Sequence, residues 1–371
     1  MASKEEVISA LRLINTDRIG PVKFYQLVDE FGSPDNALAF LEKNSKQKPW
    51  SIEQAENEVA KAKKLGVTIL LYSDNDYPQA LKGDRNSPPI LYVKGDVSTL
   101  NYDKAIAIVG GRSASITGRK TAAKIAMELT EANVCVISGM ARGIDTSAHK
   151  GAMYAQNQTG KTIAVLGTGI DVVYPPENKE VYEQIAKQGC IISEFLIGTK
   201  ANTSNFPRRN RVVAALSEGV LVVEASNNSG SLITAQYGID LQKIIFAVPG
   251  TPGESRTQGS NSLIKNGAIL VEDASDILPF LKGNKKVEQQ SLEQYVQKNL
   301  VFENNDDNYI EQEKAPETLK DYLTVDGVHI DELIRLTGKS ASEIAGEIVE
   351  LELSGIVERR AGNKIALTGD K

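Results

Sequence analysis

The feature that most constrains this fold is a unit repeated through the middle of the chain. Each unit has an apolar run rich in Val and Ile, a turn containing Gly or Ser, and then a helical stretch. The runs are AIAIVG, VCVISG, TIAVLG, CIISE, GVLVVEA, KIIFAVPG and AILVE. Runs without polar alternation are typical of strands buried on both faces, as in a parallel sheet covered by helices. The pattern predicts an α/β fold with a doubly wound, mainly parallel sheet.

The segment before this domain, residues 1–71, has a different pattern. Short amphipathic helical stretches are interrupted at Gly20-Pro21, at Gly32-Ser33-Pro34 and at Gly66, which predicts a small helical domain. Its first two helices and the intervening glycine form a layout that can contact a DNA backbone through amides at a helix N-terminus. A generic helical module with no DNA contact fits the same pattern.

Two segments follow the α/β domain, which we place at residues 72–282. Residues 283–316 are strongly polar, as in FENNDDNYIEQEK, and are interpreted as a linker. Residues 317–371 contain three helical stretches and then a two-strand pattern around Ala361-Gly362-Asn363, the outline of a winged helix. The stretch SASEIAGEIVELELSG carries four glutamates, which favours a protein contact or a vestigial role over DNA reading.

Composition excludes several classes of protein. With 41% hydrophobic and 24% charged residues, the chain resembles an ordinary globular protein. It has no apolar run of membrane-spanning length and no signal-like N-terminus, so we expect a cytoplasmic protein without membrane contact. Cys135 and Cys190 lie inside apolar runs and are interpreted as buried small hydrophobes. A net charge of −6 excludes a histone-like polycation but not a local basic groove.

Two motifs for nucleotide cofactors fail. Gly160-Lys161-Thr162 resembles the end of a phosphate-binding loop, but Ala155 replaces the required glycine and a strand follows instead of a helix. The segment GTGIDV lacks the third glycine of a dinucleotide-binding turn. We therefore expect no cofactor, and the two widely separated cysteines and two histidines give no zinc pattern.

Ligands of open parallel sheets bind beyond the carboxyl ends of the strands, so the turns there matter most. The run AIAIV is followed by Gly110-Gly111-Arg112-Ser113 and a helix. The glycines let a backbone approach an anion, the helix N-terminus presents amides, and the Arg112 guanidinium suits phosphate. The alternative is a tight turn in which Arg112 only pairs with a carboxylate.

A second turn, Ser138 to Asp145, follows the run VCVI. Ser138-Gly139 predicts an amide nest at a helix start, and Arg142 lies nearby. Asp145 and His149 are four residues apart, about one helical turn, which would allow a hydrogen bond between them. Because no nucleophile or metal cluster accompanies the pair, we favour bracing of the loop over acid–base chemistry.

The segment Asn205-Phe206-Pro207-Arg208-Arg209-Asn210-Arg211 precedes an apolar helix. Cations beside an aromatic ring are typical of proteins that grip single-stranded nucleic acid. Either Arg209 or Arg211 can instead be held by Glu194 or Glu224 at neighbouring strand ends. A further turn, Ser226 to Ala235, opens a helix with hydroxyls and amides and no acid, which predicts another anion cradle.

These motifs together resemble one bacterial family. The series VGGR, SGMARGID, LGTGIDVVYPPEN, FPRRNR, VVEASNNSGSLITA and AVPG is similar to the DNA-processing protein family DprA, also called Smf, over residues 74–278. The resemblance implies a Rossmann-like central domain, an N-terminal helical domain like a sterile alpha motif, and a C-terminal winged helix. It departs at Gly111, where the family often has Ser or Thr, and at Gln242-Lys243, where Gly-Arg is common.

The resemblance also implies a function. It predicts a protein without catalytic residues that binds and protects incoming single-stranded DNA, forms a homodimer through the Rossmann-like domain, and loads RecA recombinase in natural transformation, or competence. The predicted DNA contacts are Gly111, Arg112, Ser113, Ser138, Gly139, Arg142, Phe206, Arg208, Arg209, Asn210, Arg211, Ser229, Gly230, Ser231 and Thr234.

An enzyme on the same scaffold is the alternative hypothesis. Related Rossmann-like phosphoribohydrolases, which act on nucleoside monophosphates, place a glutamate after a glycine-rich turn. The corresponding turn here, NSGSLITAQY, has no acid after Thr234, whereas departure of a base needs a titratable group within reach. This disfavours the enzyme.

Overall fold

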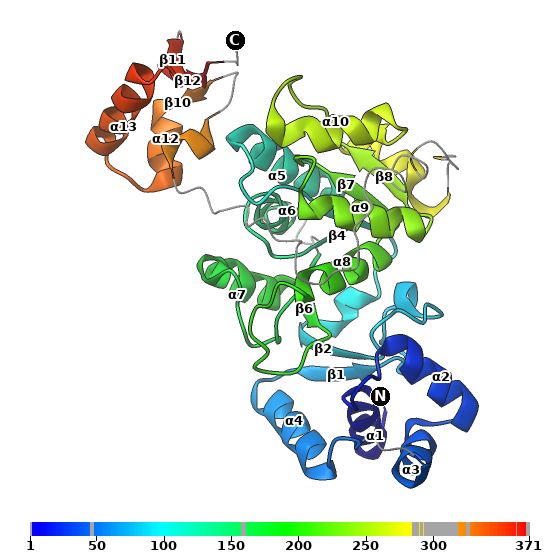
Figure 1. Cartoon of the computed structure of the whole chain (residues 1–371). Helices are drawn as coiled ribbons and strands as arrows, with labels where there is room; N and C mark the ends of the chain where they lie inside the picture. Colours follow the sequence, from blue (N-terminus) through cyan, green and yellow to red (C-terminus); the bar gives the residue numbers. More distant parts are fainter. Residues whose placement is uncertain are drawn as a thin grey trace.

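The computed structural model describes residues 2–44, 48–156, 161–283, 289, 292, 318–323, 327–360 and 362–368. The predicted linker, 283–316, lies outside the described residues except at three positions. None of the described helices is long and apolar enough to cross a bilayer. From one end to the other, the chain forms a helical domain, a central sheet covered by helices and a winged helix (Figure 1).

The N-terminal domain has four short helices whose ends follow from the sequence. They are α1 (Lys4–Ile14), α2 (Pro21–Phe31), α3 (Pro34–Asn44) and α4 (Ile52–Lys64). Ser3 and Ser51 each form a capping box with the residue three positions later, which satisfies amides at the helix start. Gly20 precedes Pro21 at the start of α2, and Gly32 ends α2 in the left-handed conformation that glycine tolerates. The predicted interruptions are confirmed.

The central sheet has nine described strands in the order β1-β2-β6-β5-β4-β3-β7-β8-β9. The strands are β1 (Thr68–Leu71), β2 (Ile90–Gly95), β3 (Ala105–Val109), β4 (Cys135–Ser138), β5 (Thr162–Leu166), β6 (Cys190–Ser193), β7 (Gly219–Val222), β8 (Ile244–Ala247) and β9 (Ile269–Leu270). Strands β3 to β9 pair with one another in parallel. The doubly wound, mainly parallel sheet is confirmed.

One edge of the sheet differs from the sequence analysis. Residues 68–71, assigned there to the helical segment, form β1, which pairs antiparallel with β2. Strand β2 in turn pairs antiparallel with β6. The physical reason is burial: Leu70 and Leu71 are almost fully buried, in cores that continue into the central domain and the N-terminal helices. The helical domain and the sheet therefore share one apolar core.

Strand order changes direction at β3, which lies between β4 and β7. The side chains of alternate residues in β3 lie on opposite faces of the sheet. Ile106 and Ile108 pack toward α5 (Ile116–Glu131) and α6 (Ile144–Met153), whereas Val109 packs toward α8 (Asn205–Ala215) and α9 (Gly230–Asp240). Helix α7 (Lys179–Gln188) covers the first face beside α6, and α10 (Gln258–Lys265) the second.

Burial of these strands stabilises the fold. Ile106 and Ile108 are fully buried, and each such side chain contributes roughly 1.5–3 kcal/mol through the hydrophobic effect. Cys135 in β4 and Cys190 in β6 are buried as expected, and burial raises the pKa of the Cys135 thiol to about 12.

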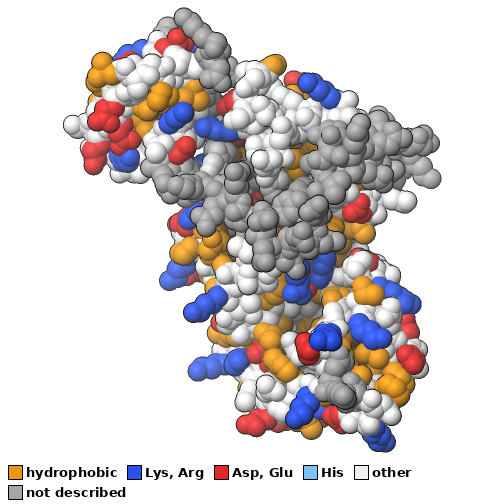
Figure 2. Space-filling model, in the orientation of Figure 1, with side chains coloured by type: hydrophobic (Ala, Val, Ile, Leu, Met, Phe, Trp, Pro, Cys, Tyr) orange, Lys and Arg blue, Asp and Glu red, His pale blue; other side chains and the backbone are white. Residues whose placement is uncertain are grey.

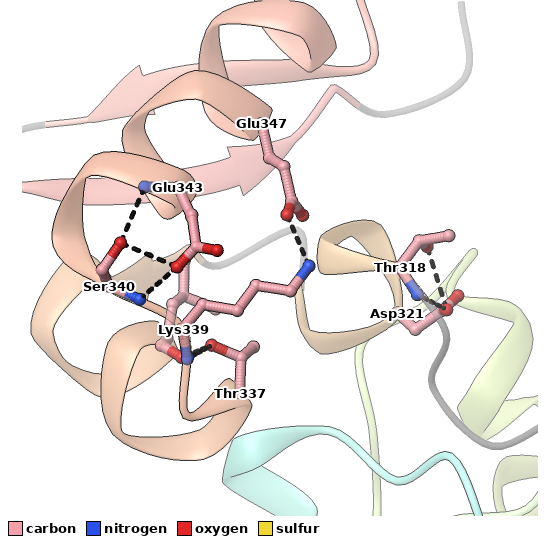
Figure 3. A network of polar contacts seen from close by, with 8 residues as sticks. Thr318, Asp321, Thr337, Lys339, Ser340, Glu343 and Glu347 are labelled. Carbon is pink, nitrogen blue, oxygen red and sulfur yellow. Dashed lines mark hydrogen bonds and ion pairs between the residues drawn. The ribbon is translucent and has the colours of Figure 1, made fainter.

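The winged helix contains β10 (Val328–His329), α12 (Ile330–Thr337), α13 (Ala341–Leu353), β11 (Val357–Arg360) and β12 (Lys364–Leu367). Where the sequence analysis expects a first helix, the described residues form one 3₁₀ turn, Leu319–Tyr322, and then β10. Figure 3 shows the polar contacts that fix the start of α13: Ser340 and Glu343 cap each other, and Lys339 pairs with Glu347.

The winged helix contacts α5 of the central domain. Glu332 pairs with Lys120 at 2.7 Å, and the Arg119 guanidinium lies 5.7 Å from the centre of the Tyr322 ring. Burial at this contact lowers the pKa of Arg119. Basic and acidic side chains are interspersed over both ends of the face shown in Figure 2, so neither end of this face is uniformly basic.

Candidate nucleic-acid interface

A crevice opens where the strand order changes direction. Its cavity of about 80 Å³ is lined by residues after β3 (Gly110 and Arg112) and after β7 (Asn228 to Ser231), together with the first turns of α8. The two turns diverge because one strand leads to α5 and the other to α9. Such switch points are where open α/β sheets bind ligands.

A cation and two aromatic rings stand together at this crevice. The Arg112 guanidinium lies 5.4 Å from the centre of the Phe206 ring. Tyr174 lies on Phe206 with ring centres 5.6 Å apart, and it is 40% exposed. Guanidinium and aromatic faces attract each other and also offer stacking surfaces to other planar groups. Tyr174 was missed by the sequence analysis, although a tyrosine before two prolines was a visible signal.

The N-terminus of α5 does not offer the free amides that the sequence analysis expects. The Glu224 carboxylate accepts a hydrogen bond from the Ser115 amide at 2.8 Å and another from the Ser115 hydroxyl. The Ser115 hydroxyl accepts from the Gly118 amide at 2.9 Å, and the Gly111 amide donates to the Glu224 carbonyl oxygen. A carboxylate from the neighbouring strand end therefore already occupies this anion position.

The predicted amide nest after β4 is also occupied. Asp145 Oδ2 accepts from the amides of Gly139 and Ala141 at 3.1 and 3.3 Å, so the chain supplies its own anion there. The possible Asp145–His149 hydrogen bond does not form: His149 Nδ1 lies 2.8 Å from the Thr162 hydroxyl instead. Asp145 thus braces the loop, as the sequence analysis favoured. Ser138 is fully buried, and its hydroxyl donates to the Ile108 carbonyl oxygen.

Arg209 lies beneath the crevice rather than on its surface. It is 5% exposed, and its guanidinium donates to the carbonyl oxygens of Val165, at 2.6 Å, and of Gly139. Burial lowers the pKa of Arg209 to about 10. Two backbone carbonyls hold this side chain in the floor of the cavity, so its contact with DNA stays a prediction.

The other arginines of the segment point away from the cavity. Arg211 donates to Glu194 Oε2 at 2.6 Å and to the Asn86 carbonyl oxygen, and Arg208 reaches the same carboxylate oxygen at 3.4 Å. The alternative in which Glu194 holds Arg211 is confirmed. Arg142 is paired with Glu177, a contact that lowers the pKa of the Glu177 carboxyl.

The turn that opens α9 keeps the character predicted for it. Ser229 caps the helix, and its hydroxyl lies 2.8 Å from that of Ser231. Gly230 is exposed, and an added Cβ there meets no atom within 4 Å. The first turn of α9, with the positive end of its dipole, therefore faces the crevice with no acidic residue in that turn.

The structure brings part of the predicted contact set together. Of the described residues, the cavity lining includes Arg112, Gly139, Phe206, Arg209, Asn210, Ser229, Gly230, Ser231 and Thr234. It does not include Gly111, Ser113, Ser138, Arg142, Arg208 or Arg211. It adds residues that sequence reasoning missed as contacts, among them Asp145, Thr203, Pro207 and Asn228. The described residues contain no cluster that could hold a metal ion.

Comparison with known families agrees with this geometry. The family described as DNA recombination-mediator protein A matches residues 68–282, more than half of the chain. The chain belongs to this family. A DprA-like N-terminal HHH domain matches residues 4–62, and a DprA winged-helix domain matches residues 307–363.

Relatives in this family span several bacteria. A Smf protein of Synechocystis is 32% identical over 79% of this chain and 78% of its own length. A DNA processing protein DprA of Streptococcus pneumoniae is 40% identical over 55% of this chain and 71% of its own.

Two solved structures of the family superimpose on this fold. DprA of S. pneumoniae gives a TM-score of 0.62 at 30% identity, covering 76% of this chain and 99% of that one. DNA processing protein A of Helicobacter pylori, solved for its single-stranded DNA binding mode, gives 0.52 at 29% identity, covering 57% and 94%. The Rossmann-like assignment of the central domain and the family predicted from the sequence are confirmed.

Proposed function

We propose that this chain binds single-stranded DNA at the crevice between β3 and β7. The observation that carries the proposal is the contact of the Arg112 guanidinium with the Phe206 ring, which also contacts Tyr174. Arg112 and Phe206 share the cavity lining with the first turn of α9. A guanidinium and a helix N-terminus suit a phosphate, and an exposed aromatic face suits a base. The single-stranded DNA binding mode described for the H. pylori relative supports the same ligand.

The occupied amide nests change which residues we propose as contacts. Glu224 and Asp145 fill two of the three predicted anion positions, so phosphate contacts concentrate on Arg112 and the turn from Ser229 to Ser231. Phe206 and Asn210 lie between them in the cavity lining. We propose that Arg208 and Arg211, which lie outside the cavity lining, contribute at the neighbouring surface of α8. Arg209 contributes by holding the floor of the crevice in place.

The test is a fluorescence anisotropy titration of Arg112→Ala with a labelled oligonucleotide at several salt concentrations. Wild-type affinity should fall steeply with salt, and loss of one phosphate contact should reduce the slope of log K against log salt by about 0.7. Lys161→Ala is the matched control, because Lys161 precedes β5 at the opposite end of the sheet and pairs with Asp96. An affinity and slope for Arg112→Ala equal to those of wild type would overturn the site assignment.

We also propose that the chain binds DNA without catalysis. The carboxylate in the cavity lining, Asp145, is engaged by two backbone amides and is buried, which raises its pKa. Bracing of the loop explains why Asp145 is buried and hydrogen-bonded, and no catalytic role is needed to explain it. Incubation with nucleoside monophosphates should release no free base; release that Arg112→Ala or Asp145→Asn abolishes would revive the phosphoribohydrolase alternative.

We also propose two protein partners, RecA recombinase and a second copy of this chain. As a member of a recombination-mediator family, the chain is proposed to load RecA recombinase onto incoming DNA in the cytoplasm during natural transformation, as a homodimer formed through the Rossmann-like domain. Leu270 on β9, the last strand of the described sheet, is 45% exposed, and we propose it as an apolar contact of this dimer. Sedimentation should give twice the monomer mass, and RecA should assemble on coated DNA faster with this protein than without it.

A further inference from the structure

A second, larger cavity lies apart from the crevice, at the junction of the N-terminal helices and the sheet. Its volume is about 580 Å³, within the range of sites for small organic groups. One wall comes from the end of α1 and the hairpin before α2, and the other from the segments 88–92 and 194–199. The Glu58 carboxylate on α4 accepts a hydrogen bond from the Ile197 amide at 2.7 Å, which ties the N-terminal domain to the segment 194–199.

Glu194, one of the residues that line the cavity, has a carboxylate oxygen without a hydrogen-bond donor in the described part of the chain. The Glu194 side chain is 6% exposed and lines the cavity. Its Oε2 accepts from Arg208 and Arg211, whereas no donor in the described part of the chain reaches the buried Oε1. A buried acceptor without a donor costs about 1–3 kcal/mol, so a ligand that donates to Oε1 gains affinity there.

Charge decides which kind of donor fits. Glu194 carries one negative charge and already shares it with two guanidinium groups, so this cluster has a net positive charge. Arg18, in the hairpin before α2, also lines the cavity. A cationic ligand would be repelled by these side chains, while a neutral N–H donor attached to an anionic group matches both the free oxygen and the arginines.

The walls favour a flat ring. Pro88, Pro89 and Phe195 line the cavity with apolar surfaces, and the Arg208 guanidinium lies 5.1 Å from the centre of the Phe195 ring. A nucleobase has flat apolar faces and an edge of donors and acceptors, with a phosphate attached through its sugar. Carboxylate side chains accept from the exocyclic amino group of cytosine, whereas thymine presents a carbonyl oxygen at that position.

The crevice and this cavity are lined by neighbouring residues of α8. Pro207 lines the crevice, and Arg208, the next residue in α8, lines the cavity. We infer that the cavity at Glu194 is a nucleobase site, in which one amino-bearing base of a bound single strand, typically cytosine, donates to Glu194 Oε1 while its phosphate lies near Arg208. The inference rests on the proposed function, because the strand is held at the crevice.

The test compares labelled dC and dT oligonucleotides of equal length at neutral to slightly basic pH. Wild type should bind dC roughly five-fold more tightly than dT. Glu194→Gln removes the anchor of Arg208 and Arg211 and should weaken both, but it should also bring the dC-to-dT ratio close to one. A merely structural Glu194 would weaken both oligonucleotides equally and leave the ratio unchanged, which would overturn the inference.

Photocross-linking locates the base directly. An oligonucleotide carrying 5-iododeoxycytidine should cross-link to peptides containing residues 11–21 or 195–199. Leu196→Trp, which fills the cavity, should abolish these cross-links, and Val349→Trp on the remote helix α13 should keep them. Cross-links confined to residues 203–213 and 225–235 would overturn this inference while supporting the crevice. No binding of either oligonucleotide would overturn the proposed function as well.

Discussion

The Glu224 carboxylate accepts a hydrogen bond from the Ser115 backbone amide at 2.8 Å, across 109 residues of sequence. Glu224 follows β7, and Ser115 is the N-cap of α5 after β3, so this contact joins the two turns that diverge at the crevice. The carboxylate acts as a built-in anion at a helix N-terminus. It fixes the start of α5 and with it the turn that carries Arg112.

Removing this carboxylate should both destabilise the fold and open an anion site. Glu224→Ala loses the hydrogen bonds from the Ser115 amide and hydroxyl, so we expect the free energy of unfolding to fall by roughly 2–3 kcal/mol. Sulfate should then stabilise the variant more than wild type, because it binds the vacated helix N-terminus. Urea unfolding with and without sulfate measures this, with Glu180→Ala, at an exposed position of α7, as control. Equal stabilisation by sulfate would contradict it.

Arg209 should matter for stability more than its neighbours do. Arg209→Ala leaves the carbonyl oxygens of Gly139 and Val165 buried without this donor, which should lower the free energy of unfolding by roughly 2–5 kcal/mol. Arg209→Lys should retain only part of this unfolding free energy, because an ammonium lacks the planar fork of a guanidinium. Arg208→Ala, at a side chain 54% exposed, should change stability by less than about 1 kcal/mol. Urea titration of the three variants decides between these roles.

The sheet was largely predictable because its strands carry the signal locally. Runs such as Ala105–Val109 are apolar without alternation, which only a strand buried on both faces needs. Strand order was not predictable, since it depends on which distant strand pairs with β3. The edge strand Thr68–Leu71 was missed for a similar reason: four residues after a helix carry little pattern, and pairing with β2 decides their conformation.

The site was predictable only where its chemistry is local. Arg112 and Phe206 stand out in sequence as a cation after a glycine turn and an aromatic beside arginines. Nothing local shows that Glu224 and Asp145 fill the neighbouring amide positions, because one contact spans the domain and the other depends on the loop conformation. Gln242 is a second example of a feature that the local sequence does not show. Its backbone adopts φ +56°, a conformation that favours glycine, the residue expected here from the family resemblance.

Gly143 should be required for the geometry of the Arg112 turn. It adopts φ +74°, and an added Cβ would lie 2.3 Å from the Gly111 carbonyl oxygen and 2.6 Å from that of Arg112. Gly143→Ala should therefore displace this turn and lower both stability and affinity for single-stranded DNA.

Gly198→Ala is the matched control for this substitution. Gly198 also has a positive φ, +85°, but an added Cβ there meets nothing within 4 Å, so it should cost only about 1–2 kcal/mol of backbone strain. Urea unfolding and anisotropy titration of both variants separate strain from collision. DNA affinity that falls equally in the two variants would contradict a specific role for Gly143.

His149 should make stability depend on pH. Burial, together with Arg209, lowers the pKa of its imidazole to about 3, whereas the unfolded value is about 6.5. Between these two pKa values only the unfolded state binds the proton. The folded state is therefore most stable above pH 6.5, and the free energy of unfolding falls by about 1.4 kcal/mol per pH unit as pH falls toward 3. His149→Gln should flatten this slope in urea titrations at pH 4–8, while His329→Gln at the partly exposed second histidine should keep it. An unchanged slope in His149→Gln would assign the acid sensitivity to carboxyl groups instead.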